Sequence, residues 1–247
     1  MIKYCLIFAW LVCIATGSSA QSYSGLGAAY GAFVRGGDWA DTYGNSQVVS
    51  GRAEHRFANR ITLALSADVF FGQDVLIDPL SSLRTAEGSI LGDLRAQATP
   101  ANTVLKARGQ RYSVLAGYQL PVGDAGWSLR GAVGPSYLVH FIRIQEDATL
   151  NASNLREDYK RGYDRRAGGW GGMAELGAQV TLADGGFIVY GVATVALAQT
   201  SALRSTQFDL QAPAPVDGTD ASFGVRLGVM LALLRNTSAR EADEIYY

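Results

Sequence analysis

Histidine beside serine is the residue combination in this chain that most readily suggests catalysis. The 247-residue sequence holds two histidines, and Ser136 precedes His140 by four residues, whereas His55 has no such neighbour. A hydrolytic site needs a nucleophile, a base and a group that orients the base. Neither histidine lies in a motif with that spacing. We therefore expect packing or hydrogen bonding for His140, and we assign no catalytic residue.

Carboxylates and cysteines do not form a recognisable metal site either. Asp38 and Asp41 lie in the turn-rich segment Gly36–Gly44, but Ca²⁺ usually takes about six or more oxygen ligands, so a tight loop is the better interpretation. Both cysteines fall within the first twenty residues. We expect no metal and no cofactor, and we keep Asp38, Trp39 and Asp41 as candidate loop contacts.

A basic run between residues 156 and 166 is the second candidate contact segment. It extends from Arg156 to Arg166, and its candidate contact residues are Tyr159, Lys160, Arg161, Tyr163, Asp164 and Arg165. Such a run can bind anionic lipid head groups or a protein partner, and a solvated loop held by its own ion pairs is an equal alternative.

Composition excludes one class of partner. Charged residues make up 17% of the chain and the formal net charge is −1. A nucleic-acid-binding domain carries a strong positive field, which this sequence lacks. We expect no nucleic-acid partner.

The elements that must carry these residues follow from a period of two in hydrophobicity. Between residues 61 and 71, apolar side chains occupy the odd positions and more polar ones most of the even positions, as in a strand with two different faces. The same alternation recurs at residues 26–34, 49–57, 112–120, 127–141, 174–182 and 222–233. Residues 187–198 are apolar on both faces. We therefore predict a strand there, but the pattern does not indicate which of its side chains point inward.

Connection lengths give an independent signal. Short links at residues 58–60, 121–126 and 183–186 alternate with long ones at residues 36–46, 73–107, 145–168 and 199–219. Bacterial outer-membrane barrels have short periplasmic turns and long external loops. The predicted fold is all-β: an eight-stranded antiparallel up-and-down transmembrane β-barrel with long extracellular loops and short periplasmic turns.

The polar face distinguishes this barrel from a soluble one such as a lipocalin. In a soluble barrel the polar face contacts water and carries many lysines. This chain has only Lys3, Lys106 and Lys160. Its polar positions are mostly Gly, Ser, Ala and Thr, which suit a narrow lumen. Aromatic residues gather near the predicted strand ends, as at membrane interfaces. The apolar face is therefore predicted to meet lipid.

Charged residues on the inward face are the candidate lumen network. By parity they are Arg52, Glu54, Arg56, Asp68, Arg111, Arg130, Glu175 and Arg226. An isolated buried charge costs several kcal/mol, so a network of mixed sign is predicted. The network is either a structural plug or an ion path, and the narrow interior of eight strands favours the plug.

The N-terminus has the pattern of an export signal. Lys3 supplies positive charge, residues 4–14 are apolar, and the segment ends in small residues at Ala20. We predict a signal peptide over residues 1–20 cleaved after Ala20, an outer-membrane barrel over residues 21–235 and a periplasmic tail over residues 236–247. The predicted location is the bacterial outer membrane.

Several motifs resemble a family of largely uncharacterised Bacteroidota outer-membrane barrels. They are Gly36-Gly37-Asp38, Tyr43-Gly44, Leu83-Arg84-Thr85, Ile142-Arg143-Ile144 and the run from Tyr159 to Arg165. The resemblance implies an OmpA-like or OmpX-like small barrel that is an accessory to an export or barrel-assembly complex. It carries over no catalytic residue, and the tail after residue 235 departs from the pattern.

The functional hypothesis is a non-enzymatic outer-membrane barrel. It is a structural or accessory subunit of a secretion or barrel-assembly complex, making contacts through its loops, above all residues 73–107. Its partners would be outer-membrane lipid and other outer-membrane or periplasmic proteins. The alternatives are a small channel or a passive envelope-stabilising barrel, and an outer-membrane hydrolase or acyltransferase is the least favoured.

Overall fold

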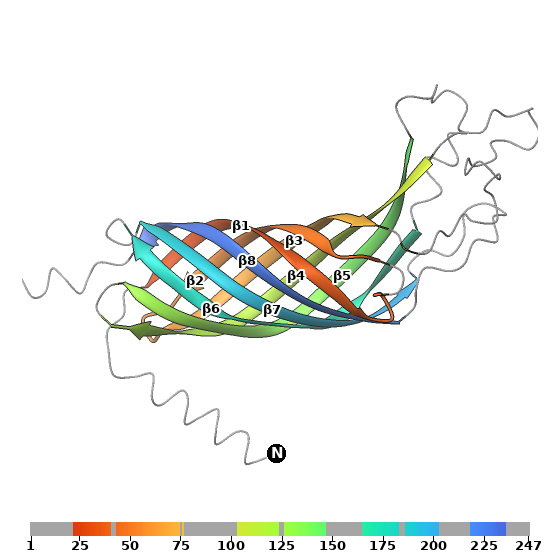
Figure 1. Cartoon of the computed structure of the whole chain (residues 1–247). Coiled ribbons are helices and arrows are strands. Elements are labelled where there is room, and N and C mark those ends of the chain that lie inside the picture. Colours follow the sequence, from red (N-terminus) through yellow and green to blue (C-terminus); the bar gives the residue numbers. More distant parts are fainter. Residues whose placement is uncertain are drawn as a thin grey trace, which may run out of the picture.

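The computed structural model of the chain is a closed antiparallel β-barrel (Figure 1). The structure describes residues 22–40, 43–74, 76, 103–123, 126–146, 165–182, 186–202 and 218–235. Over these residues the strands are β1 (Tyr23–Gly37), β2 (Ser46–Arg56), β3 (Ile61–Asp74), β4 (Thr103–Val122), β5 (Trp127–Glu146), β6 (Arg165–Leu182), β7 (Phe187–Ala202) and β8 (Gly218–Arg235). Each strand pairs with the next, and β8 pairs with β1. The predicted eight-stranded up-and-down barrel is confirmed.

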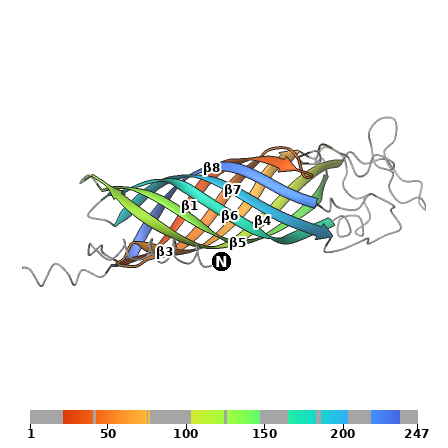
Figure 2. The same ribbon diagram turned by 90° about the horizontal axis from the view of Figure 1, so that it is seen from below.

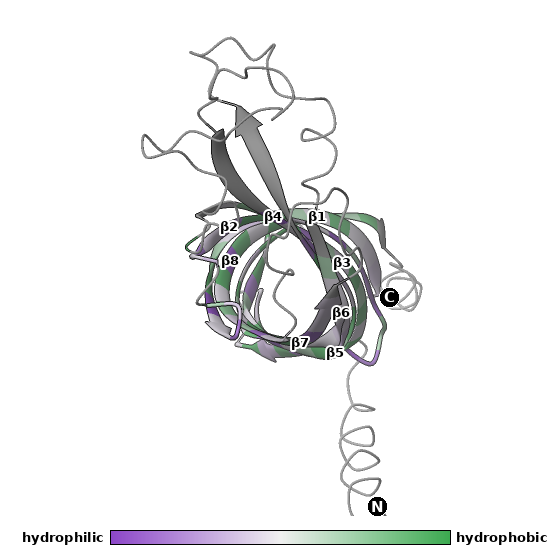
Figure 3. Cartoon of the chain, turned by 90° about the vertical axis from the view of Figure 1, so that its right-hand side faces the viewer, coloured by the Kyte–Doolittle hydropathy of each residue, from purple (hydrophilic) through white to green (hydrophobic). Residues whose placement is uncertain are grey.

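The strands slant across the long axis of the barrel, and polar and apolar residues alternate along them (Figures 2 and 3). In β3, Leu65 points outward with 57% of its surface exposed, whereas Asp68 is only 1% exposed. Successive side chains of a strand point to opposite faces, so one face must enter the lumen. The facings predicted for seven strands are all confirmed.

The facing of β7, which the sequence left open, is decided by its neighbours. Val192 pairs with the inward-facing Arg226 of β8, and Thr194 pairs with the inward-facing Glu175 of β6. Ile188 and Tyr190 therefore also enter the lumen, where they form an apolar cluster with Met230. The lumen at this level is therefore lined by buried apolar side chains as well as polar ones.

Several strands are longer than predicted at the end of the barrel that carries the long connections. β4 already begins at Thr103 and β5 continues to Glu146, inside the predicted connections 73–107 and 145–168. β6 begins at Arg165, which the sequence placed in a loop, and Lys106 lies in β4. The hydrophobic alternation fades here while the backbone ladder continues, which is why the pattern missed these ends.

At the other end the strands follow one another after only a few residues, at 57–60, 123–126 and 183–186. In the first turn the Phe57 amide donates to the Ile61 carbonyl at 2.9 Å, and Arg60 adopts a φ of 68°. Gly123 and Gly126 have φ values of 64° and 74° in the second turn, a region that glycine enters without a steric penalty. Pro121, predicted within this turn, is instead part of β4.

Among the described residues, no helix is long and apolar enough to cross a membrane. The predicted signal peptide at residues 1–20 and the predicted tail at residues 236–247 both lie outside the described residues.

Candidate functional site

The candidate site is a network of ion pairs inside the barrel. Its members are Arg52 and Glu54 of β2, Asp68 of β3, Arg130 of β5, Glu175 of β6 and Arg226 of β8, all nearly inaccessible to solvent. They occupy inward positions of strands that are distant in sequence, and only closure of the barrel brings them together. All six belong to the predicted lumen set.

Glu54 and Glu175 connect the arginines. The Glu54 carboxylate accepts hydrogen bonds from Arg52 Nε at 2.8 Å and Arg130 Nη2 at 2.5 Å. The other carboxylate, Glu175, accepts from Arg52 Nη1 at 2.8 Å and from Arg226 Nη2. Each carboxylate therefore lies between two guanidinium groups.

Arg226 extends the network to β3. Its Nη1 donates to Asp68 Oδ1 at 2.7 Å, and the Ser50 hydroxyl donates to the same carboxylate oxygen at 2.6 Å. Three arginines thus face three carboxylates. A buried charge without a partner is strongly destabilising, and this balance removes that penalty.

Neutral side chains occupy further positions around Glu54 and Arg130. Tyr23 Oη and Gln119 Nε2 each donate to Glu54 Oε1 at 3.0 Å. Arg130 Nη1 donates to Gln179 Oε1 at 3.0 Å. Charge-assisted bonds of this kind hold the side chains in one arrangement, so the network behaves as a packed part of the interior.

A second ionic cluster lies nearer the end with the long connections. Arg35 Nη1 donates to Asp220 Oδ1 at 2.7 Å, and Arg111 Nη2 donates to Asp220 Oδ2 at 3.2 Å. Arg111 was predicted to face the lumen, but Arg35 and Asp220 were not. The predicted alternation ended at residue 34 in β1 and began at residue 222 in β8. Continuing the inward positions to residue 35 in β1 and to residue 220 in β8 would have found both.

Arg56, also in the predicted lumen set, stands apart from both groups. Its guanidinium lies 5.9 Å from the centre of the Tyr23 ring, near the end with the tight turns. Within the described residues it forms no ion pair, and its membership in the charge network stays a prediction. The side chain is partly buried, and its Nε has no hydrogen-bond partner among the described residues.

His140 is a packing residue of the second cluster. Its Nε2 lies 2.8 Å from Arg35 Nη2, and its ring centre is 4.4 Å from that of Trp39. A Cβ added at Gly109 would come within 2.7 Å of the imidazole, so the glycine leaves room for the ring. Ser136 makes no hydrogen bond to His140 among the described residues.

His55 does have a serine partner, which the sequence reasoning did not find. Ser24 Oγ and His55 Nδ1 are 2.8 Å apart across the β1–β2 ladder, on the outer face of the barrel. The Phe57 ring packs edge-on against the imidazole. Among the described residues no carboxylate orients this histidine, so the pair lacks the third member of a hydrolytic site.

Trp39, predicted as a loop contact, is fully buried. After β1 the chain turns back, and the Tyr43 amide donates to the Trp39 carbonyl at 2.9 Å. The indole Nε1 then donates to Thr200 Oγ1 at 2.9 Å, and the two rings of Trp39 and Tyr43 pack at 4.9 Å. A large apolar ring gains free energy by leaving water, so this side chain closes the lumen and is not available to a partner.

The other predicted loop contacts are only partly described. Asp38 is exposed, and its Oδ2 accepts a hydrogen bond from the Thr219 amide at 2.8 Å. Asp41, Tyr159, Lys160, Arg161, Tyr163 and Asp164, together with the side chain of Arg165, lie outside the described residues. Within the described part, no three His, Cys, Asp or Glu side chains are placed to hold a metal ion.

The geometry supports a closed interior. Phe33, Phe70 and Leu138 form a fully buried cluster beside the second ionic cluster. The Arg111 guanidinium lies next to both phenylalanine rings, 5.5 Å from the centre of Phe33 and 5.1 Å from the centre of Phe70. Paired charges and apolar side chains therefore fill the described lumen, and the network has the properties of a plug.

Comparisons with known proteins place the chain beside small outer-membrane barrels. No family model matches the sequence, and no curated protein matches it. The chain is similar to the outer-membrane protein OprG of Pseudomonas aeruginosa, with 14% identity and a TM-score of 0.46 over 87% of this chain and 97% of that one.

Two further solved structures are similar at the same level. The Neisserial surface protein NspA has 11% identity and a TM-score of 0.44, over 86% of this chain and 97% of that one. Ail, the attachment invasion locus protein of Yersinia pestis, has 11% identity and a TM-score of 0.42, over 86% of this chain and all of that one. Both similarities concern the fold alone, and the Bacteroidota family stays a prediction.

Proposed function

We propose that the protein is a non-enzymatic integral outer-membrane barrel that serves as a structural or accessory subunit of an envelope complex. The observation that carries the proposal is the inverted distribution of polarity. Leu227 and Leu176 are outward-facing and 74% and 71% exposed, whereas charged side chains such as Arg111 are buried in the lumen. A water-soluble protein does not expose so continuous an apolar surface.

A bilayer explains this distribution physically. Hydrocarbon cannot hydrogen-bond the backbone, so a spanning β-structure must close on itself and satisfy every ladder internally. A closed barrel pairs all of its strands with one another, and its apolar exterior can contact hydrocarbon. The predicted export signal at residues 1–20 and the low lysine content of the chain agree with an outer-membrane location.

The accessory role is supported by two features: the side chains that occupy the lumen and the long connections at one end of the barrel. The described side chains fill the lumen, so we assign partner binding to the ends or the wall of the barrel. The connections at residues 38–45, 75–102, 147–164 and 203–217 all leave the same end of the barrel. Loops on a rigid barrel commonly carry binding, and we assign the partner contacts to these segments.

Membrane location is tested by fractionating cells and treating the envelope with carbonate and urea. We expect the protein to stay in the outer-membrane fraction and to run faster on gels before boiling than after it, as a folded barrel does. Recovery as a detergent-free monomer in the soluble fraction would contradict the proposal.

The accessory role is tested by affinity purification from envelopes extracted in mild detergent. We expect defined proteins to co-purify with the full chain and to be lost when residues 75–102 are replaced by a short Gly-Ser linker. Shortening residues 183–186 at the opposite end is the matched control and should retain them. If the protein is in the outer membrane but elutes alone under every mild condition, the accessory role is contradicted. A passive envelope-stabilising barrel is then the remaining function.

A further inference from the structure

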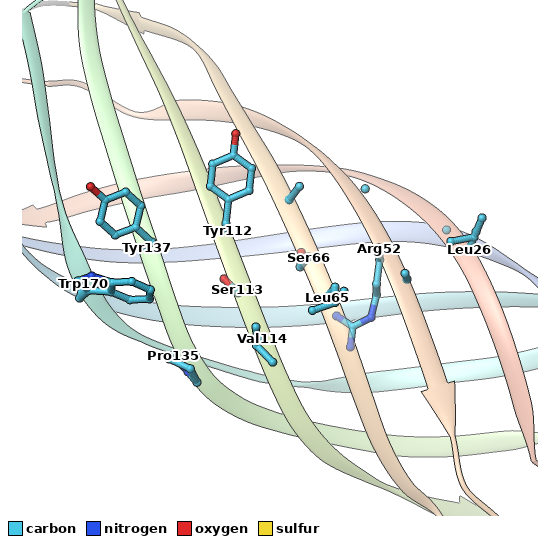
Figure 4. Close-up of a pocket in the computed structure, with 14 residues that line it drawn as sticks. Leu26, Arg52, Leu65, Ser66, Tyr112, Ser113, Val114, Pro135, Tyr137 and Trp170 are labelled. Carbon is cyan, nitrogen blue, oxygen red and sulfur yellow. The ribbon is translucent and has the colours of Figure 1, made fainter.

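The outer wall of the barrel is hollowed across β1 to β6 (Figure 4). The hollow has a volume of about 700 Å³ and an almost wholly apolar lining. Its lining includes the small outward residues Gly51, Ala53 and Ala67, which we call its floor. Larger side chains such as Leu26 and Leu65 also line it (Figure 4). We call this feature the wall groove.

The floor is low because β2 carries the small outward residues Gly51 and Ala53, and β3 carries Ala67 opposite Gly51. Gly51 pairs with Ala67, and Ala53 pairs with Leu65. A Cβ added at Gly51 would meet no atom within 4 Å, so the space above it is open. Neighbouring strands lie about 4.8 Å apart, so a floor of two strands is roughly as wide as one hydrocarbon chain with its contacts.

Aromatic side chains bound the groove on the β4 to β6 side. Tyr112 pairs with Tyr137, and Tyr137 pairs with Trp170, so the three lie in one row across the strands. The Tyr137 and Trp170 rings are 5.0 Å apart, and Trp170 is 70% exposed. Rings with one polar atom favour the level of lipid head groups, so this row marks the polar end of whatever fills the groove.

We propose that the wall groove holds one acyl chain of a membrane lipid, with the head group at the Tyr112–Tyr137–Trp170 row; this rests on the proposed membrane location. The outward lining offers hydrocarbon contact but no charged group for recognition of a protein. A second barrel has a convex wall that cannot reach a floor about two strands wide. A flexible chain can follow the floor and bury apolar surface along it.

The first test fills the groove. The double variant Gly51→Leu, Ala67→Leu places side chains over the floor. Ala193→Leu, the control, adds one leucine side chain on the outer face of β7, away from the groove. Native mass spectrometry of barrels extracted in mild detergent should find one retained lipid on the wild type and on the control. The double variant should show at least a tenfold lower lipid-bound fraction.

Other results would overturn the proposal. They are equal retention by all three proteins, equal loss in the control, or a wild-type barrel that carries no lipid. A dimer mass that disappears in the double variant would assign the groove to a second copy of the chain. Gel mobility before and after boiling checks that each variant is folded.

A second measurement separates this inference from the proposed function. The chain has four tryptophans, and a variant with Trp10, Trp39 and Trp127 changed to Phe keeps Trp170 alone. In vesicles of phosphatidylcholine brominated on the acyl chains, Trp170 fluorescence should be quenched. Quenching without a retained lipid would remove the groove site and keep the membrane location. Absence of quenching in correctly folded protein would contradict both.

Discussion

Glu175 is the residue on which the central network depends. Its two carboxylate oxygens bond to Arg52 of β2 and to Arg226 of β8, the two strands that pair with β1. The three side chains are at most 3% exposed, so water cannot replace a lost partner. The alternation predicted that each residue faces inward, but parity alone does not say which arginine meets which carboxylate.

Removing this charge tests the network. Glu175→Gln should lower the free energy of unfolding by about 3–5 kcal/mol, because it leaves two buried guanidinium groups without full compensation. The measurement is reversible urea unfolding in lipid vesicles. Asp38→Asn, which changes an exposed carboxylate, is the control and should change stability by about 1 kcal/mol or less. Equal effects of the two substitutions would contradict a stabilising network.

At the level of elements, the β1–β2 connection differs most from its prediction. A turn-rich segment with two aspartates indicated a solvent-facing loop, and the exposed Asp38 agrees with that. The next residue, Trp39, turns inward and packs on His140. Local sequence could not indicate this, because the receiving surface is built from β5 and β7, which lie far along the chain.

Substitution of Trp39 separates packing from hydrogen bonding. Trp39→Ala should destabilise the barrel by about 3–5 kcal/mol through the cavity that it leaves. Trp39→Phe keeps most of the ring contact and loses only the bond to Thr200, for an expected loss of about 1 kcal/mol. Unfolding in urea gives both values. If the two variants were equally stable, the side chain would not be packed into the lumen.

At the scale of the whole molecule, closure of the sheet determines whether ions can pass through the barrel. The interior contains paired charges and fully buried aromatic side chains in place of an open path, as expected when eight strands enclose a narrow space. The small channel weighed from the sequence is therefore not supported by the described residues. The remaining ways to act are through the ends and the wall.

Planar-bilayer recording tests the plugged interior directly. We expect the purified wild-type barrel to give no sustained conductance in neutral salt solution, because Phe33, Phe70 and Leu138 fill the lumen beside the Arg35–Asp220 pair. Glu175→Gln serves as a comparison, because it removes the carboxylate that bonds to Arg52 and Arg226. We expect this variant to show brief openings and no sustained conductance. Stable openings of the wild type would require an open path and would contradict the packing.

The sequence by itself determined the number of strands, the inward and outward faces of seven of them, and the exterior placement of apolar residues. These follow from the two-residue period, which is a property of local backbone geometry. Only the tertiary structure decided the facing of β7, the pairing of Arg35 with Asp220 and the burial of Trp39. Each of these depends on the register in which distant strands meet when the sheet closes, and no local pattern contains that information.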